Sequence, residues 1–221
     1  YSIDANYLIT AKQTIANTGT APISASSFAL IDRLGKPTDP HEQDSWTIHV
    51  GPTGYLGGKS VFDVNYKDLD AGTDAKYDSA GWLGFTDKYW LAAVVPAKGE
   101  RVSASITSPA SNNYQTLFAR NFAQVAPGQQ LTTTSRIFAG AKEVSILSKY
   151  QDKDGITRLS NAIDWGWFEF FEVPIFKLLD WLFRMVGNFG VAIMLLTLII
   201  RALMFPIAQR QLNGATIAEQ A

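Results

Sequence analysis

The feature that most constrains this 221-residue chain is an apolar run near its C-terminal end. From Phe189 to Ile207, 19 consecutive residues contain a single charged side chain, Arg201. With a rise of about 1.5 Å per residue, a helix of this run would be about 28 Å long, close to the hydrocarbon thickness of a bilayer. The run therefore predicts a transmembrane helix over residues 188–208. The alternative is a helix buried in a protein core, which would need neighbours on all its sides.

Arg201 is the side chain most indicative of function. It lies 13 positions after Asn188, well inside the predicted span. An arginine deep in a bilayer costs about 3 kcal/mol on insertion scales, so such a residue usually faces a bundle interior or a watery cavity. Thr197 is four residues earlier on the same helical face, which indicates a polar stripe. The open alternative is that the arginine reaches the membrane surface about two turns away.

The segment before the span, residues 159–187, has the pattern of an amphipathic helix at a membrane surface. Its charged side comprises Glu169, Glu172, Lys177, Asp180 and Arg184. Its apolar side comprises Phe168, Phe171, Ile175, Leu178, Leu179, Leu182 and Val186. We expect five aromatic residues to lie in the membrane interface, namely Trp165, Trp167, Phe168, Phe171 and Trp181. Pro174 is expected to split the helix, and the open alternative is that its apolar face packs on the preceding domain.

Residues 1–158 are more polar and predict an antiparallel β-sandwich, so the fold class is mainly β. Strand-length runs separated by Gly and Pro turns include Trp90–Val95, Val102–Thr107, Tyr114–Arg120 and Leu131–Phe138. Ser108-Pro109 is expected to end the second of these strands, and Ala141–Tyr150 predicts one short helix. Tyr1–Thr10 already has the character of a strand, so we expect the domain to continue upstream of Tyr1.

The composition argues against several classes of function. The net charge is −1, so the chain has no strong electrostatic basis for binding nucleic acid. It has no cysteine, and the spacing of its two histidines, His41 and His49, matches no metal motif. No catalytic constellation is evident, so we expect neither an enzyme nor a cofactor or metal site.

The orientation of the predicted span follows from the residues after it. Arg210 follows the span, and no acidic residue occurs until Glu219. By the positive-inside rule, the tail over residues 209–221 is expected in the cytoplasm and the sandwich on the other side of the membrane.

Three groups of residues resemble the YidC family of bacterial membrane-protein insertases. Gly187-Asn-Phe-Gly190 and Ile200-Arg-Ala-Leu-Met-Phe-Pro206 resemble the first helix of that family's conserved membrane region. Asp164-Trp-Gly-Trp167 and Pro174-Ile-Phe-Lys-Leu-Leu179 resemble its periplasmic-surface helix. Gly81-Trp82 and Lys88-Tyr-Trp-Leu-Ala-Ala-Val-Val-Pro96 resemble its periplasmic domain.

The resemblance implies a protein of the bacterial inner membrane. It implies a β-supersandwich in the periplasm and a membrane region of five helices that enclose a hydrophilic groove. Arg201 matches the groove arginine by position, and Thr197 lies on its face. The implied function is an insertase and chaperone that receives polar substrate segments in the groove. The implied partners are nascent inner-membrane proteins, Sec translocon components and membrane lipid.

The chain departs from the family pattern in three respects. The first membrane anchor, the other four spans and the basic cytoplasmic hairpin of the family are not in this sequence. One helix cannot enclose a groove, so we expect this chain alone not to insert proteins. The rival interpretation is a single-pass anchored module that binds a carbohydrate or an envelope partner, with Arg201 reaching the headgroups.

Overall fold

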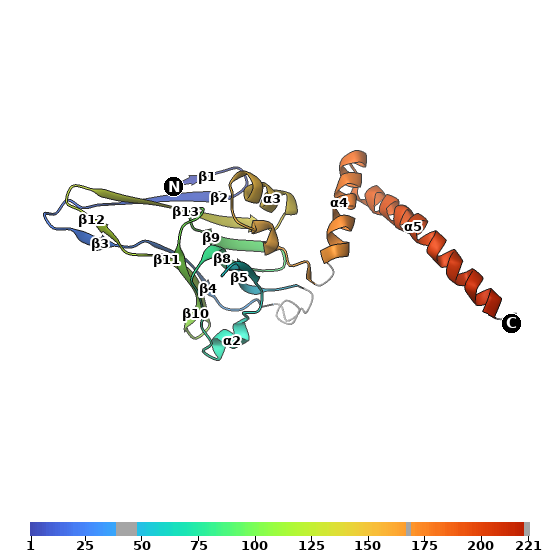
Figure 1. Ribbon diagram of the computed structural model, residues 1–221, viewed down its shortest axis with the longest axis horizontal. Helices are drawn as coiled ribbons and strands as arrows, with labels where there is room; N and C mark the ends of the chain where they lie inside the picture. The colour runs from blue at the N-terminus through green and yellow to red at the C-terminus, as the bar shows by residue number, and fades with distance from the viewer. Residues whose placement is uncertain (39–47, 167–168, 219–221) are drawn as a thin grey trace. The chain divides into compact units, whose positions relative to one another are not determined.

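The computed structural model describes residues 1–38, 48–166 and 169–218. The chain divides into two compact units, Tyr1–Asp164 and Trp165–Ala221. The first unit consists mainly of β-strands and the second consists of helices (Figure 1). The predicted fold class, mainly β and followed by an apolar helix, is confirmed.

Within the described residues, the strands of the first unit form two larger sheets and one ribbon, in which every pairing is antiparallel. The seven-stranded sheet contains, in spatial order, β1 (Ser2–Ile3), β2 (Leu8–Ala16), β13 (Gln130–Ala141), β9 (Trp90–Val95), β8 (Ala80–Thr86), β5 (Gly51–Leu56) and β6 (Lys59–Val61). The four-stranded sheet contains β4 (Phe28–Leu34), β11 (Asn113–Arg120), β10 (Val102–Ala110) and β7 (Ala75–Tyr77). The ribbon pairs β12 (Ala123–Val125) with β3 (Ile23–Ala25).

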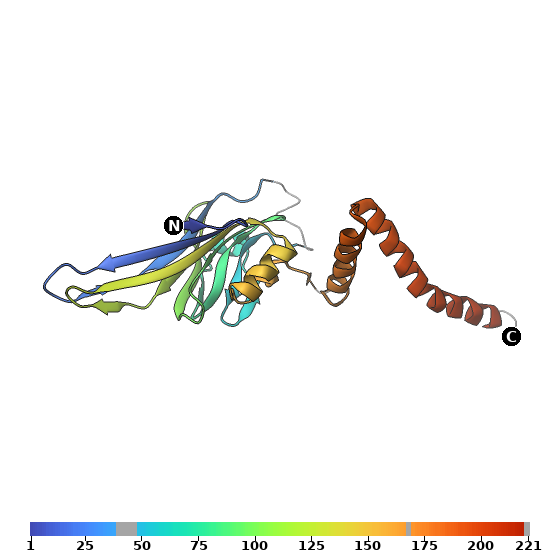
Figure 2. The same cartoon turned by 90° about the horizontal axis from the view of Figure 1, so that it is seen from above.

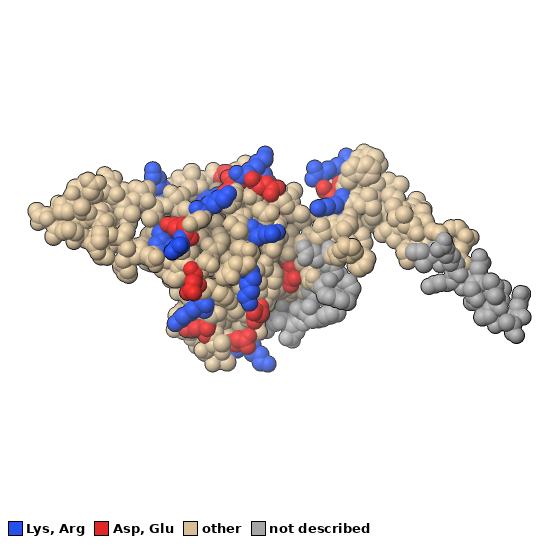
Figure 3. Space-filling view, viewed as in Figure 1, with Lys and Arg blue, Asp and Glu red and all other residues tan. Residues whose placement is uncertain are grey.

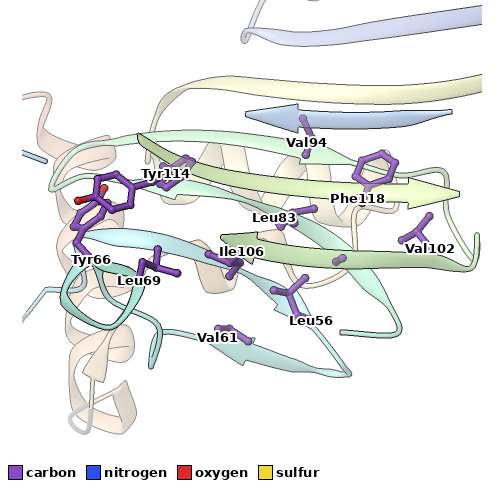
Figure 4. Close-up of a cluster of buried hydrophobic side chains, with 12 residues drawn as sticks. Leu56, Val61, Tyr66, Leu69, Leu83, Val94, Val102, Ile106, Tyr114 and Phe118 are labelled. Atoms are coloured by element: carbon purple, nitrogen blue, oxygen red, sulfur yellow. The ribbon is translucent and has the colours of Figure 1, made fainter. Parts of the chain in front are cut away.

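The main core lies between the two larger sheets (Figure 4). Alternate residues of β11 are buried, as expected for a strand with one face on a core. The seven-stranded sheet contributes Leu56, Leu83, Phe85 and Val94, and the four-stranded sheet contributes Val102, Ala104, Ile106, Tyr114 and Phe118. The short helix α2 (Tyr66–Asp70) closes one end of this core with Tyr66 and Leu69. The predicted sandwich is therefore observed.

A second core lies on the other face of the seven-stranded sheet. The helix α3 (Val144–Lys153), which lies over the sheet in Figure 2, and the 3₁₀ turn η1 (Leu159–Ala162) cover this face. Leu147 and Tyr150 of α3 pack here with Trp82 of β8, which is fully buried. Because both faces of this sheet are covered, its central strands β8 and β9 are buried almost along their whole length.

Two local predictions about this unit need correction. β10 does not end at Ser108-Pro109 but continues to Ala110, with a register irregularity between Thr107 and Ala110. β7 pairs with β10 only as far as Ile106, so the proline removes no ladder hydrogen bond on that side. The short helix begins at Val144 because residues up to Ala141 still pair with β9.

The second unit contains α4 (Glu169–Val186) and α5 (Phe189–Ala218). Pro174 was expected to split the first of these helices, but α4 continues through it. The fixed φ of proline is compatible with a helix, and the missing N–H removes a single backbone hydrogen bond. Pro206 lies inside α5 in the same way.

Asp4 connects the turn between β1 and β2 to α3. The Tyr150 hydroxyl donates to both carboxylate oxygens at 2.7 Å, and the backbone N–H groups of Asn6 and Leu8 donate to Oδ1 at 2.9 Å. Partial burial raises the pKa of Asp4, but these hydrogen bonds outweigh it, and the net pKa is lowered. The ionised carboxylate therefore stabilises the folded sandwich.

We expect the free energy of unfolding to decrease as the pH falls below about 4, the ordinary pKa of an aspartate. Above that pH Asp4 is ionised in both the folded and the unfolded chain, so its stabilisation is fully present. As the pH falls through the lower pKa of the folded state, the unfolded chain takes up the proton first and the stabilisation is lost. The substitution Asp4→Asn should lower the urea midpoint of unfolding at about pH 7. Between about pH 7 and pH 3, the midpoint of this variant should fall less than that of the unmodified protein. The exposed Asp74→Asn is the control, and an unchanged acid response in Asp4→Asn would contradict the prediction.

Candidate functional site

The junction between α4 and α5 consists of two residues, each suited to its place. Gly187 has φ +67°, and its N–H donates to the Phe183 carbonyl at 2.8 Å, which ends α4. The Asn188 side chain accepts from the Val191 N–H at 3.2 Å, which caps the start of α5. The sequence therefore specifies a sharp turn here, and the two helices fold back on each other.

The two helices pack through a small apolar core of their own. Leu182 of α4 is buried against Ala192 and Leu196 of α5. Partly buried neighbours extend this contact along both helices, namely Leu178, Leu179, Val186, Leu195 and Ile199. The C-terminal half of the predicted apolar face of α4 thus packs on α5, whereas Phe171 and Ile175 of the same face are exposed.

Beyond this contact, α5 exposes most of its apolar surface. Phe189–Pro206 is long and apolar enough to cross a membrane, and only 11% of it is buried. A core helix would be mostly buried, so the exposure favours the membrane interpretation. On the face of α5 that Figure 3 shows, no charged side chain is visible outside the grey residues. Large exposed side chains cover this helix, including Met194, Leu198, Leu203, Met204 and Phe205.

Arg201 and Thr197 lie on the face of α5 that points away from α4. Ile199, which packs on α4, precedes Arg201 by two residues, and two residues turn a helix by about 200°. Thr197 lies one turn before Arg201, so the two side chains share a face. The structure therefore brings the two predicted site residues together and separates them from the α4 contact.

The polar groups on this face differ in how they are bonded. The Thr197 hydroxyl donates to the carbonyls of Ile193 and Met194, at 2.8 Å each, so it is satisfied within its own helix. Arg201 is exposed and has neither a hydrogen bond nor an ion pair to any side chain that the structure describes. The guanidinium has five N–H donors, which leaves it available to bind an acidic or polar group.

The predicted interfacial aromatic residues are placed as follows. Phe171 and Trp181 are exposed on α4, and Trp165 packs edge-on against Phe176 with ring centroids 5.6 Å apart. Trp167 and Phe168 lie outside the described residues. Phe170, which was not predicted, is 80% exposed and stacks edge-on with Phe171 at 5.2 Å. Its position beside Phe171 in the sequence was the available signal.

His49, the histidine that the structure describes, is bonded within the sandwich. His49 is partly buried, its Nε2 donates to the Pro52 carbonyl at 2.9 Å, and its ring meets Phe62 edge-on. Burial lowers the pKa of His49, so the neutral ring is favoured. His41 lies outside the described residues. Among the residues that are described, no group of three metal-binding side chains occurs.

Comparison with known proteins gives consistent matches along the chain. The family model described as the YidC periplasmic domain matches residues 1–178. Relatives named "Membrane protein insertase YidC" include those of Rhizobium etli, 40% identical over 214 residues, Paracoccus denitrificans, 39% over 220, and Zymomonas mobilis, 37% over 214. In each case the match covers 95% of this chain but 34–36% of the relative, so the chain spans about a third of these proteins.

The family match covers both cores of the sandwich and continues into α4, and the matches to the relatives, at 95% of the chain, extend into α5. The resemblance seen in the sequence is thus confirmed at the level of the family. On this combination of fold, apolar helix and similarity, the chain belongs to the YidC family of membrane protein insertases.

Proposed function

We propose that this chain is part of an inner-membrane insertase and chaperone, in which Arg201 and Thr197 line a hydrophilic groove. The remaining walls of the groove would come from further membrane spans of the complete insertase. The observation that carries the proposal is the arrangement of α5, which buries apolar residues on α4 and turns its arginine to the opposite, uncovered face. An arginine there is costly in lipid, so it needs a polar surrounding.

The physical role of the groove is to lower the desolvation cost of moving a polar segment across lipid. A hydrophilic segment of a nascent inner-membrane protein enters the groove, where Arg201 offers a positive charge to its acidic or polar groups. The apolar helix of the substrate then moves sideways into the bilayer, driven by the transfer of apolar surface out of water. This sequence of events needs neither covalent chemistry nor a cofactor.

The same proposal assigns places to the parts of the chain. Residues 1–158 form the periplasmic domain, 159–187 the surface helix, 188–208 the span and 209–221 a cytoplasmic tail. Trp165, Trp167, Phe168, Phe171 and Trp181 would lie in the headgroup layer, where aromatic side chains are favoured. Sec translocon components and membrane lipid are the proposed partners, besides the substrates.

The test is insertion of a substrate with an acidic translocated tail by the complete protein in vesicles. The substitution Arg201→Ala should reduce insertion about tenfold, the equivalent of losing one charged hydrogen bond of about 1.5 kcal/mol. Arg201→Lys should retain part of the activity, because it keeps the positive charge but loses the planar fork of donors.

Leu198→Ala is the matched control, since Leu198 is exposed on the same helix and has no polar group. Its insertion activity should stay within about twofold of the unmodified protein. Unchanged insertion by Arg201→Ala would contradict the groove proposal and favour an anchored binding module, in which the arginine only reaches the headgroups.

A further inference from the structure

Two large aromatic residues that are adjacent in the sequence are exposed at one end of the sandwich. Tyr89 and Trp90 lie at the turn between β8 and β9, and they are 64% and 61% exposed. Lys88 precedes them, and its Nζ lies 5.2 Å from the centre of the Tyr89 ring. Exposed Trp and Tyr beside a cation are typical of surfaces that contact the lipid headgroup layer.

The turn that carries this aromatic pair is firmly held. The Asp87 N–H donates to the Trp90 carbonyl at 2.9 Å, and the Lys142 N–H donates to the Tyr89 carbonyl at 2.8 Å. Asp87 is also paired with Arg33 at 2.7 Å. The two rings are therefore presented on a preformed support, and little further ordering is needed when they meet a surface.

The pair lies at the end of the sandwich from which the chain leaves. Lys88 and Tyr89 line the same surface hollow as Ile163 and Asp164, the last residues of this unit. The opposite end of the sandwich is far away. The strand β13, which is 12 residues long, runs between the two ends: its Ala141 pairs with Trp90 of β9, and its Gln130 pairs with Ala16 of β2. That length corresponds to about 36 Å.

The connection to the helical unit is short. From Asp164 to Glu169, the first residue of α4, the chain advances five residues. Five residues reach at most about 18 Å. If α4 lies in the headgroup layer, as the proposed function has it, the aromatic end of the sandwich is within reach of the same layer.

We infer that the Lys88–Trp90 turn docks the sandwich onto the phospholipid headgroup layer of the bilayer that α5 crosses. Tyr89 and Trp90 would place their rings among the headgroups, where the apolar ring and the polar N–H or O–H are both satisfied. Lys88 would lie close to the lipid phosphates. This contact would fix the orientation of the sandwich above the membrane, and it rests on the proposed membrane placement of α5.

The test uses the 221-residue chain reconstituted in vesicles of phosphatidylethanolamine and phosphatidylglycerol. Since the chain has no cysteine, a fluorophore can be attached at one introduced site, Glu143→Cys, Thr20→Cys or Leu198→Cys. Glu143 is exposed and lines the same hollow as Lys88 and Tyr89, so the label lies beside the docking turn without replacing any of its residues. Lipids with a nitroxide on the headgroup should quench the label at position 143 about threefold more than the label at position 20, which lies at the opposite end. Acyl-chain nitroxides should quench the label at position 198.

A second variant separates docking from mere proximity. With the label at position 143, the double substitution Tyr89→Ser and Trp90→Ser should lower headgroup quenching to the level at position 20. If the label at 198 remains quenched, the inference is overturned by quenching at 143 that stays high in this variant, or by equal quenching at 143 and 20 in the chain with the native turn. Absence of quenching at 198 overturns the inference and the proposed function together.

Discussion

The substitution Gly84→Ala is expected to prevent the sandwich from folding stably. A Cβ atom at Gly84 would lie 1.9 Å from the Ala92 carbonyl oxygen and 2.7 Å from the Ala93 Cα. Both neighbours are backbone atoms of β9, and β8 is also held on its other side, where Thr53 of β5 pairs with Gly84. The strands cannot separate without loss of ladder hydrogen bonds, so we expect a loss of more than about 3 kcal/mol.

The measurement is urea unfolding in detergent, followed by near-ultraviolet circular dichroism of the buried aromatic side chains. Gly19→Ala is the matched control, because a Cβ at Gly19 would meet only the Asn17 side chain, at 3.3 Å. Gly19→Ala should lower the free energy of unfolding by no more than about 1 kcal/mol, because only one side-chain oxygen has to shift. A Gly84→Ala protein with unchanged unfolding would show that β8 and β9 do not approach each other so closely.

Much of the fold could be predicted from local patterns, because those patterns reflect local physics. Trp90–Val95 coincides with β9, and Tyr114–Arg120 lies within β11, since β-branched and aromatic residues suit half-buried strands. The order of the strands was not accessible, because it depends on contacts between segments such as β2 and β13, more than a hundred residues apart. β10 continues through Pro109 because its neighbour β7 pairs with it only as far as Ile106. A local sequence pattern does not show where a neighbouring strand ends.

The candidate site was partly accessible for a related reason. A single charge in an apolar run is conspicuous, so Arg201 and its neighbour Thr197 could be selected from the sequence. The direction in which they point could not, because it depends on the packing of Leu182 against Ala192 and Leu196. The exposure of Tyr89 and Trp90 could not be predicted from the sequence either, because aromatic residues beside a strand are usually buried.

Arg120 illustrates a residue whose importance no sequence pattern revealed, and its replacement is the second large effect that we expect. It is buried on β11 and its Nε donates to Glu100 at 2.6 Å. Its two terminal nitrogens donate to the Ser27 and Ser135 hydroxyls, at 3.1 and 3.2 Å, and to the Thr134 carbonyl at 2.9 Å. Because Ser135 and Thr134 belong to β13, this one side chain connects the two sheets.

The substitution Arg120→Met keeps most of the side-chain volume but leaves those acceptors without their donor. We expect it to lower the free energy of unfolding by about 3 kcal/mol, the lower end of the range for a broken buried ion pair. The lower end applies because the Glu100 side chain is 27% exposed and retains a hydrogen bond from the Ala97 N–H. Urea unfolding in detergent, as described for Gly84→Ala, measures this loss of unfolding free energy.

The control for Arg120→Met is Lys59→Ala, which removes the exposed Lys59–Asp63 pair and should change the unfolding free energy by less than about 0.5 kcal/mol. Arg120→Lys should restore only part of the stability, since one ammonium group cannot reach Glu100, Ser27 and β13 together. If Arg120→Met were as stable as the control, the connection between the sheets would depend on apolar packing alone. If Arg120→Met is destabilised as expected, the polar contacts of this side chain help to hold the two sheets together.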